Sequence, residues 1–86
     1  MAVKINLESI ETLGRIIRFH RRQAGLSRIA LADIADVGKT VVYDIENGKA
    51  TVRMTTLLKI LEALNIFLNM DSPLMDYFEE QDDENR

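Results

Sequence analysis

The feature that most constrains this chain is the segment 26–49, in which two helix-forming stretches alternate with turn residues. Apolar side chains recur in it every three or four residues, which is the spacing of one face of an α-helix. Asp36-Val37-Gly38 interrupts this pattern, and Asn47-Gly48 ends it. The sequence therefore predicts two short helices, at about 28–35 and 39–46, joined by a tight turn. Their inward-facing residues are expected to be Leu31, Ala32, Ala35, Val42 and Ile45.

Ala32 limits how these two helices can pack. Two helices that cross steeply at short range leave no room for a larger side chain at such a position. Short helices that cross around a tight turn are typical of the helix-turn-helix, a unit whose second helix enters the DNA major groove. The sequence therefore predicts a DNA-binding protein in which the segment 39–46 is the recognition helix.

Composition narrows the class of protein further. The chain has 86 residues, 47% of them hydrophobic, so one small domain can form a packed core. It contains no cysteine and a single histidine, His20, which excludes disulfides and argues against a metal site. No apolar run is long enough for a membrane span or a signal peptide. We therefore expect a cytoplasmic, nucleoid-associated protein without cofactor, metal ion or membrane partner.

The net charge of −3 argues at first against a nucleic-acid partner, but the charge is unevenly distributed. Residues 76–86 contain six acidic residues and one arginine, whereas residues 1–75 contain ten lysines and arginines against eight acidic residues. The body of the chain is therefore mildly basic, and we expect 76–86 to be an acidic, disordered tail. Leu74–Phe78 could form another turn of helix, in which case the disorder begins at Gln81. Such a tail most often adds solubility, although it could also mimic DNA for a basic partner or offer an easily degraded segment.

Two further helices are expected on either side of the helix-turn-helix. Ser9 is a suitable N-cap for a helix that reaches about Ala24, and Gly25 fits the left-handed position that follows a helix end. Another helix is expected at about 54–64. The inward-facing residues of these two helices are predicted to be Leu13, Ile16, Ile17, His20, Ala24, Leu57, Leu58, Leu61 and Leu64.

After the last of these helices the apolar residues alternate, which indicates a short strand at 66–70 that Ser72-Pro73 ends. Nothing else in the chain resembles a strand, so the same strand of a second copy would satisfy its backbone groups about a two-fold axis. We therefore predict a homodimer, although these residues could instead extend the helix or line the core. The predicted interface residues are Ile66, Phe67, Leu68, Asn69 and Met70.

Two motifs resemble the lambda-repressor-like (XRE/Cro) family of helix-turn-helix regulators. They are Leu-Ser-x-x-x-Leu-Ala-x-Ile-Ala-x-Val at 26–37 and Ile-Glu-Asn-Gly-Lys at 45–49. Within that family, Thr-Thr-Leu-Leu-Lys-Ile-Leu-Glu-Ala-Leu at 55–64, followed by a strand, resembles the HipB-type antitoxins. The resemblance covers about 10–72. It implies a protein that dimerises through its C-terminal strand, represses its own operon at a palindromic operator and binds a kinase-type toxin.

The expected fold is therefore mainly α, a lambda-repressor-like helix-turn-helix bundle of four to five helices with a short C-terminal strand that pairs across a dimer. This domain occupies 9–72 and follows an N-terminal arm at 1–8. The chain departs from the family at the start of the second helix, where Arg28 replaces the usual glutamine, and in the turn, where Asp36 replaces glycine. These departures bear on which operator sequence is recognised.

The position of each residue in the motif implies its role at DNA. On the recognition helix, Lys39 and Thr40 can bond base edges or phosphates, and Val41 can touch a thymine methyl group. Ser27 and the free N–H groups of the helix that follows it favour a phosphate. The predicted DNA-binding residues are Ser27, Arg28, Gly38, Lys39, Thr40, Val41, Tyr43, Asp44, Lys49, Thr51 and Arg53.

Some of these residues have a second interpretation. Asp44 accepts a hydrogen bond from cytosine, pairs with a basic neighbour such as Arg28, or is simply solvated. Tyr43 is either a phosphate contact or a half-buried flank. The resemblance implies that Arg21 pairs with Glu46 as a scaffold for the recognition helix. The other arginines of the first helix, expected to form a solvated face, are Arg15, Arg18 and Arg22.

An enzyme is not expected, because the chain lacks a glycine-rich phosphate loop, a nucleophile paired with a base and a set of metal ligands. We expect a sequence-specific transcriptional repressor, and the resemblance favours the antitoxin and autorepressor of a HipB-type toxin–antitoxin operon. One alternative is a stand-alone repressor of the phage or restriction-controller type. Another is a protein-interaction module that does not bind DNA.

Overall fold

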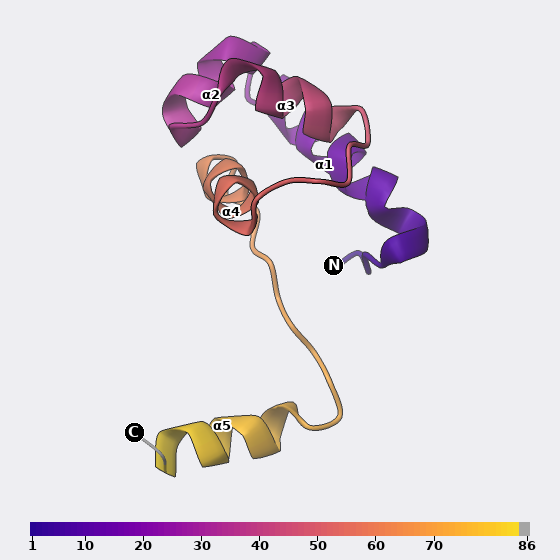
Figure 1. The fold of residues 1–86 in the computed structure, drawn as a ribbon, viewed down its shortest axis with the longest axis vertical. Coiled ribbons are helices and arrows are strands. Elements are labelled where there is room, and N and C mark those ends of the chain that lie inside the picture. Colours follow the sequence, from indigo (N-terminus) through magenta and orange to yellow (C-terminus); the bar gives the residue numbers. More distant parts are fainter. Residues whose placement is uncertain (85–86) are drawn as a thin grey trace.

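The structure is a computed structural model in which residues 1–84 are described. This part of the chain is helical and contains no β-strand. Its elements, shown in Figure 1, are the 3-10 turn η1 (Leu7–Ser9) and the helices α1 (Ile10–Gln23), α2 (Arg28–Ala35), α3 (Lys39–Glu46), α4 (Met54–Ala63) and α5 (Met75–Glu84). The predicted bounds of α2 and α3 are confirmed.

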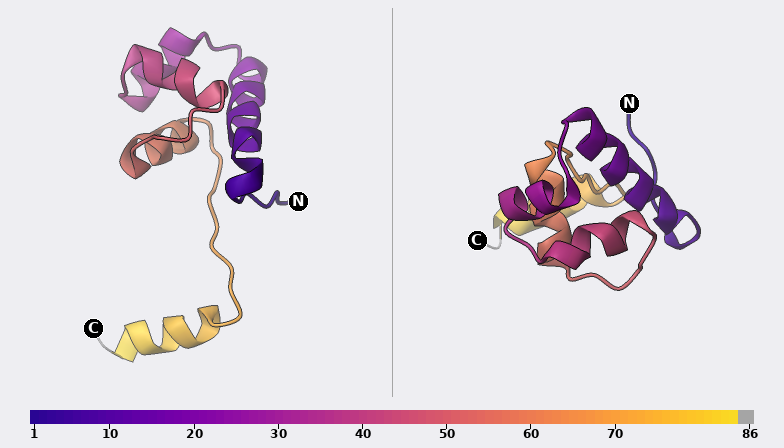
Figure 2. Two further views of the ribbon diagram at one scale, coloured as in Figure 1. Left: turned by 45° about the vertical axis from the view of Figure 1, so that its right-hand side comes forward. Right: turned by 90° about the horizontal axis from the view of Figure 1, so that it is seen from above.

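Helices α1 to α4 form one bundle, whereas α5 lies apart from it at the end of an extended segment (Figure 2). Within the bundle, α2 packs against both α3 and α4, and α1 packs against α3. Every one of these four helices contributes to the core, and the inward-facing residues predicted for α2 and α3 are confirmed. The core residues are Ile17, Leu31, Ala32, Ala35, Val42, Ile45, Leu57, Ile60 and Leu61.

The helix-turn-helix is held by short local hydrogen bonds. The Ser27 side chain accepts a bond of 3.0 Å from the N–H of Ala30 and so caps α2. Asp36 ends α2 in the left-handed region, at φ 58°, which places the N–H of Val37 3.0 Å from the carbonyl oxygen of Ala32. Aspartate adopts this conformation more easily than most residues, so the turn forms although the usual glycine is missing.

The N-terminal end of α1 differs from the prediction. Ser9 precedes α1 but its side chain makes no capping bond to that helix. Instead, the Asn6 side chain accepts bonds of 3.0 Å from the N–H groups of Glu8 and Ser9, and the Ser9 hydroxyl oxygen accepts a bond from the N–H of Asn6. The capping box therefore begins three residues earlier, around η1, and shortens the predicted arm.

The structure also corrects the predicted inner face of α1. Gly14 and Arg21 are buried, whereas His20 and Ala24 are exposed. The reason is the close approach of α1 to the end of α3, where a Cβ on Gly14 would collide with the carbonyl oxygen of Ile45. Only glycine permits this approach, and the face of α1 that meets the bundle contains Gly14, Ile17 and Arg21 but not His20.

A similar correction applies to α4. Leu57 and Leu61 are buried as predicted, but Leu58 is 37% exposed and Ile60, which was not predicted, is fully buried. Leu57, Ile60, Leu61 and Leu64 follow the spacing of a single helical face, and Leu58 lies one step away from it. The prediction was wrong because four leucines cannot all share a face that also contains Ile60.

Residues 66–70, predicted as a strand, form an extended segment without regular secondary structure in this single chain (Figure 1). Ile66 packs against the core and its N–H donates to the carbonyl oxygen of Leu61 at 2.9 Å. The next residues turn to solvent, with Phe67 83%, Leu68 53% and Met70 83% exposed. A strand needs a second strand to form its ladder, so pairing across a dimer stays a prediction.

The acidic tail is the other difference. A further turn of helix was considered possible at Leu74–Phe78, with disorder from Gln81 onward, but α5 covers Met75–Glu84 and residues 85–86 lie outside the described residues. Glutamate and glutamine favour helices, and Asp76 in the first turn interacts favourably with the helix dipole. The prediction gave too much weight to net charge and too little to these local preferences.

Candidate nucleic-acid interface

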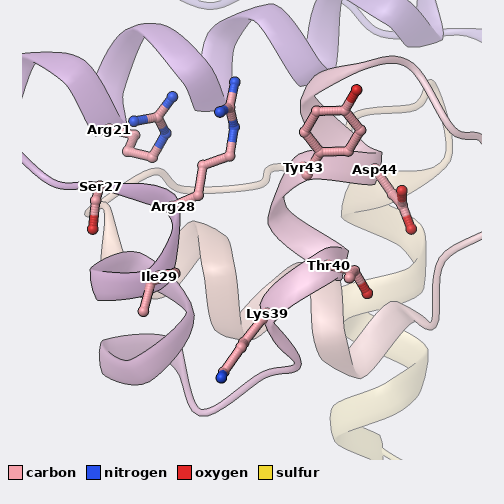
Figure 3. A pocket seen from close by; sticks show the side chains of 8 residues that line it. All are labelled: Arg21, Ser27, Arg28, Ile29, Lys39, Thr40, Tyr43 and Asp44. Carbon is pink, nitrogen blue, oxygen red and sulfur yellow. The ribbon is translucent and has the colours of Figure 1, made fainter.

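The first turn of α3 is the most accessible part of the helix-turn-helix. Gly38, Lys39 and Thr40 are all exposed, and Figure 3 shows the last two side chains projecting from the start of α3. Lysine and threonine can both donate hydrogen bonds to base edges, and threonine can accept them as well. Val41 is half-buried and packs against the core, so it presents less surface to a base than its neighbours.

A shallow pocket beside α3 brings residues from three helices together (Figure 3). Most of the predicted DNA-binding residues of α2 and α3 line it, which places them on one surface. Ile29, which is 57% exposed, was not among the predicted site residues. The sequence did contain a signal for this position, because Ile29 is apolar although it does not lie on the inner face of α2. The pocket is lined by Arg21, Ser27, Arg28, Ile29, Lys39, Thr40, Tyr43 and Asp44.

A buried ion-pair network lies beneath this surface. The Arg21 Nε donates to Glu46 Oε2 at 2.6 Å, and its Nη2 donates to Oε1 at 3.0 Å. The Arg21 Nη1 also donates to the carbonyl oxygen of Leu26 at 2.9 Å. The hydrogen bond to Glu46 raises the pKa of Arg21 above the ordinary arginine value, although burial acts in the opposite direction. The pair implied by the family resemblance is therefore present and joins α1 to the end of α3.

Arg28 adds a second cation to this network. Its Nε donates to Glu46 Oε1 at 3.2 Å, and its guanidinium lies 5.3 Å from the centre of the Tyr43 ring. A cation at this distance is attracted to the face of an aromatic ring. Figure 3 shows both side chains pointing to the same side of the motif. Arg28 thus connects the buried carboxylate of Glu46 with Tyr43, which is 54% exposed on α3.

Asp44 pairs with a basic neighbour, as one of its interpretations predicted, and that neighbour is Lys49 and not Arg28. Its carboxylate lies 3.5 Å from the Lys49 Nζ, and its carbonyl oxygen accepts a bond of 3.0 Å from the Lys49 N–H. Arg28 is engaged with Glu46 instead. The Asp44–Lys49 pair reduces the repulsion that a free carboxylate would exert on a phosphate.

The loop after α3 forms a second groove next to the first. Val52 packs against the core and anchors this loop, while Thr51 and Arg53 are exposed. Arg53 directly precedes α4, whose first N–H groups have no side-chain cap. A phosphate is favoured at such a helix start, particularly beside an arginine. The groove is lined by Val41, Asp44, Ile45, Lys49, Thr51, Val52, Arg53 and Thr56.

Other kinds of site find little support in the part of the chain that the structure describes. Among the side chains that the structure describes within residues 1–84, no three of histidine, cysteine or acidic type come together in a way that would hold a metal ion. In the same range, no helix has both the length and the apolar character needed to cross a membrane.

Comparisons with known proteins agree with this fold. A family model described as Helix-turn-helix matches residues 17–66, which include α2, α3 and α4. The uncharacterized HTH-type transcriptional regulator y4mF of Sinorhizobium fredii is 30% identical over 61 residues, covering 71% of this chain and 80% of that protein. A solved structure named MDT Protein has the same fold, with a TM-score of 0.71 and 24% identity over 84% of this chain and 99% of that one. The chain belongs to the lambda-repressor-like (XRE) family of helix-turn-helix proteins.

Proposed function

We propose that this protein is a DNA-binding transcriptional repressor that recognises a palindromic operator as a homodimer. The observation that carries the proposal is the exposed first turn of α3, which presents Lys39 and Thr40 above a rigid support. The buried Arg21–Glu46 pair fixes α3 relative to α1, so these side chains enter the groove in a defined orientation. The relative y4mF, named as a transcriptional regulator, supports the same function.

The contacts divide into two kinds. Lys39 and Thr40 read base edges in the major groove, because they stand on the recognition helix. Ser27 with the start of α2, and Arg53 with the start of α4, hold the phosphates on either side. The residues around α3 in one copy would then bind one half-site of the operator.

Dimerisation would supply the second half-site. The backbone groups of residues 67–70 make no hydrogen bond with any other part of 1–84, and their apolar side chains are exposed. Antiparallel pairing of this segment with a second copy would satisfy the backbone and cover those side chains. The two recognition helices would then be related by a two-fold axis, which is the symmetry of a palindromic operator.

The biological setting we propose is that of an antitoxin that represses its own operon and binds a kinase-type toxin. Its support is the resemblance of 55–70 to the helix and strand that end HipB-type antitoxins. A kinase-like protein that co-purifies with this chain, or a toxin gene directly beside its own gene, would support the role. Without either, the stand-alone repressor becomes the better description.

The decisive experiment is fluorescence anisotropy of a labelled duplex taken from the region upstream of this gene, against a scrambled duplex, at several salt concentrations. We expect binding that prefers the upstream duplex and weakens steeply with salt, because phosphate contacts release counterions. Lys39→Ala should lose the preference. Binding that is absent, or equal for both duplexes and insensitive to salt, would refute the repressor function and favour a protein-interaction module.

The dimer is tested separately by sedimentation equilibrium. Leu68→Asp should convert the dimer to a monomer, since it places a charge in the proposed strand pair. Leu68→Val is the matched control, because valine is a good strand former and should keep the dimer. A wild-type protein that is monomeric at all concentrations would refute the proposed dimer.

A further inference from the structure

Helix α5 has one apolar face that is open to solvent. Leu74, Tyr77 and Phe78 follow helical spacing, and their exposed fractions are 69%, 61% and 57%. The N–H of Phe78 donates to the carbonyl oxygen of Leu74 at 2.9 Å, so Leu74 belongs to the same helical turn. The acidic residues Asp76 and Glu80 occupy the opposite face. This separation of apolar and acidic faces is typical of a helix that packs on another surface.

The fold leads α5 away from its own bundle. Figures 1 and 2 both show an extended segment between the end of α4 and the start of α5, with α5 lying far from α1 to α4. The eight residues 66–73 can span up to about 26 Å when extended. If residues 66–70 pair antiparallel with a second copy, Met70 of one copy lies opposite Ile66 of the other. Ile66 packs against the core of its own bundle, so the chain that follows Met70 emerges beside the second bundle.

A strand pair alone is also too small for a stable dimer. A standard protein–protein interface uses about 20–30 residues on each side, and the predicted strand offers only the five residues of 66–70. An isolated pair of strands is at best marginally stable in water. The dimer therefore needs additional buried area, and the exposed apolar face of α5 lies directly after this segment in the chain.

Charge favours the same arrangement. Residues 1–75 carry two more basic than acidic side chains, and 76–86 carry five more acidic than basic ones. The acidic C-terminal segment as a whole is therefore steered toward the mildly basic bundle of another copy, while its acidic side chains stay on the face of α5 that points away from the contact.

We propose that α5 of each copy packs its apolar face, formed by Leu74, Tyr77 and Phe78, onto the α1–α4 bundle of the second copy. The dimer interface then consists of the paired segments at 66–70 and two exchanged C-terminal helices. This inference rests on the proposed dimer. It assigns α5 a structural role in that dimer.

Two variants on opposite faces of α5 test the proposal in the full-length protein. Tyr77→Glu/Phe78→Glu should weaken dimerisation at least tenfold in sedimentation equilibrium, whereas Glu80→Gln, on the acidic face, should change it less than threefold. Because α5 lies outside the bundle, circular dichroism should show that both variants keep the fold of α1 to α4. Equal dimer dissociation constants for the wild type and the double variant would overturn the proposal.

A photo-crosslink identifies the surface that α5 covers. Benzoylphenylalanine in place of Phe78 is introduced into unlabelled protein, which is mixed with 15N-labelled wild type before irradiation. We expect crosslinked peptides from helices α1 to α4 that carry the 15N label, which only a second copy can supply. Crosslinks confined to unlabelled peptides, or none to the bundle, would overturn the exchange of helices. A monomeric wild type would refute the proposed dimer itself. If Leu68→Asp dissociates the dimer but Tyr77→Glu/Phe78→Glu does not, the dimer stands and only this inference fails.

Discussion

Replacing Glu46 with glutamine is the sharpest test of how the recognition helix is held. The Glu46 side chain is 1% exposed and accepts hydrogen bonds from both Arg21 and Arg28. Arg21 is only 8% exposed, so it cannot turn to solvent when the carboxylate is lost. Arg28 can turn to solvent, because its side chain is 37% exposed. Glu46→Gln therefore leaves one buried, uncompensated cation between α1 and α3.

The size of the effect follows from that cation. Removing one partner of a buried ion pair costs about 3–5 kcal/mol. We expect about 3 kcal/mol here, because the amide oxygen of glutamine can still accept one bond from Arg21. A domain of this length has a free energy of unfolding of about 4–13 kcal/mol, so the loss is a large share of the total. The midpoint of thermal unfolding should fall by at least about 12 °C.

Urea unfolding followed by circular dichroism, at one fixed protein concentration, measures this loss. The double variant Arg21→Met/Glu46→Leu is the control, because removing both charges together should cost less than removing Glu46 alone. A loss below about 1 kcal/mol for Glu46→Gln would refute the reasoning. It would mean that water reaches Arg21 and that the pair does not fix α3.

Four further predictions rest on other residues. Gly14→Ala should destabilise the protein by about 1–3 kcal/mol in the same urea assay, because its Cβ would collide with the carbonyl oxygen of Ile45; an unchanged midpoint would show that α1 can move away. Asp36→Gly should stabilise it by about 0.5–1 kcal/mol by relieving the left-handed conformation, and a loss of stability would contradict this. Lys39→Ala should cost about 1–3 kcal/mol at one base pair and relax specificity, whereas Arg53→Ala should weaken all duplexes alike and lower the salt slope by about 1. The pKa of Arg21 is raised in the folded state, so its contribution to stability should be complete below the ordinary arginine pKa and lost only as the pH rises through the higher folded-state pKa. The difference in the free energy of unfolding between wild type and Arg21→Met should therefore stay constant around neutral pH.

The parts of the fold that could be predicted are those decided by local sequence. The bounds of α2 and α3 follow from the apolar spacing and from a cap at Ser27, and both are local signals. The left-handed conformation of Asp36 likewise follows from the turn. The surface of α3 follows too, because residues that do not face the core must face outward.

The parts that could not be predicted depend on contacts between helices. The inner face of α1 was wrong at His20 because α1 meets the end of α3 through the face that contains Gly14 and Arg21, and nothing in the apolar spacing of α1 alone indicates this contact. Which basic neighbour pairs with Asp44 could not be predicted from the sequence either. Two acceptors, Asp44 and Glu46, compete for Arg28 and Lys49, and only the arrangement of α2 against α3 decides which pairs form.

The replacement of glutamine by Arg28 joins stability to recognition in this protein. Arg28 has one nitrogen on the buried Glu46 and its guanidinium near the ring of Tyr43. At the proposed DNA interface, a phosphate near the start of α2 would meet a cation that already contacts Glu46 and Tyr43, so less conformational entropy would be lost on binding. Glutamine would bring neither the charge for the phosphate nor a cation for the tyrosine ring. A change at Arg28 should consequently alter DNA affinity through Tyr43 as well as through the lost phosphate contact, so the effects of Arg28→Gln and Tyr43→Ala on binding should not be additive.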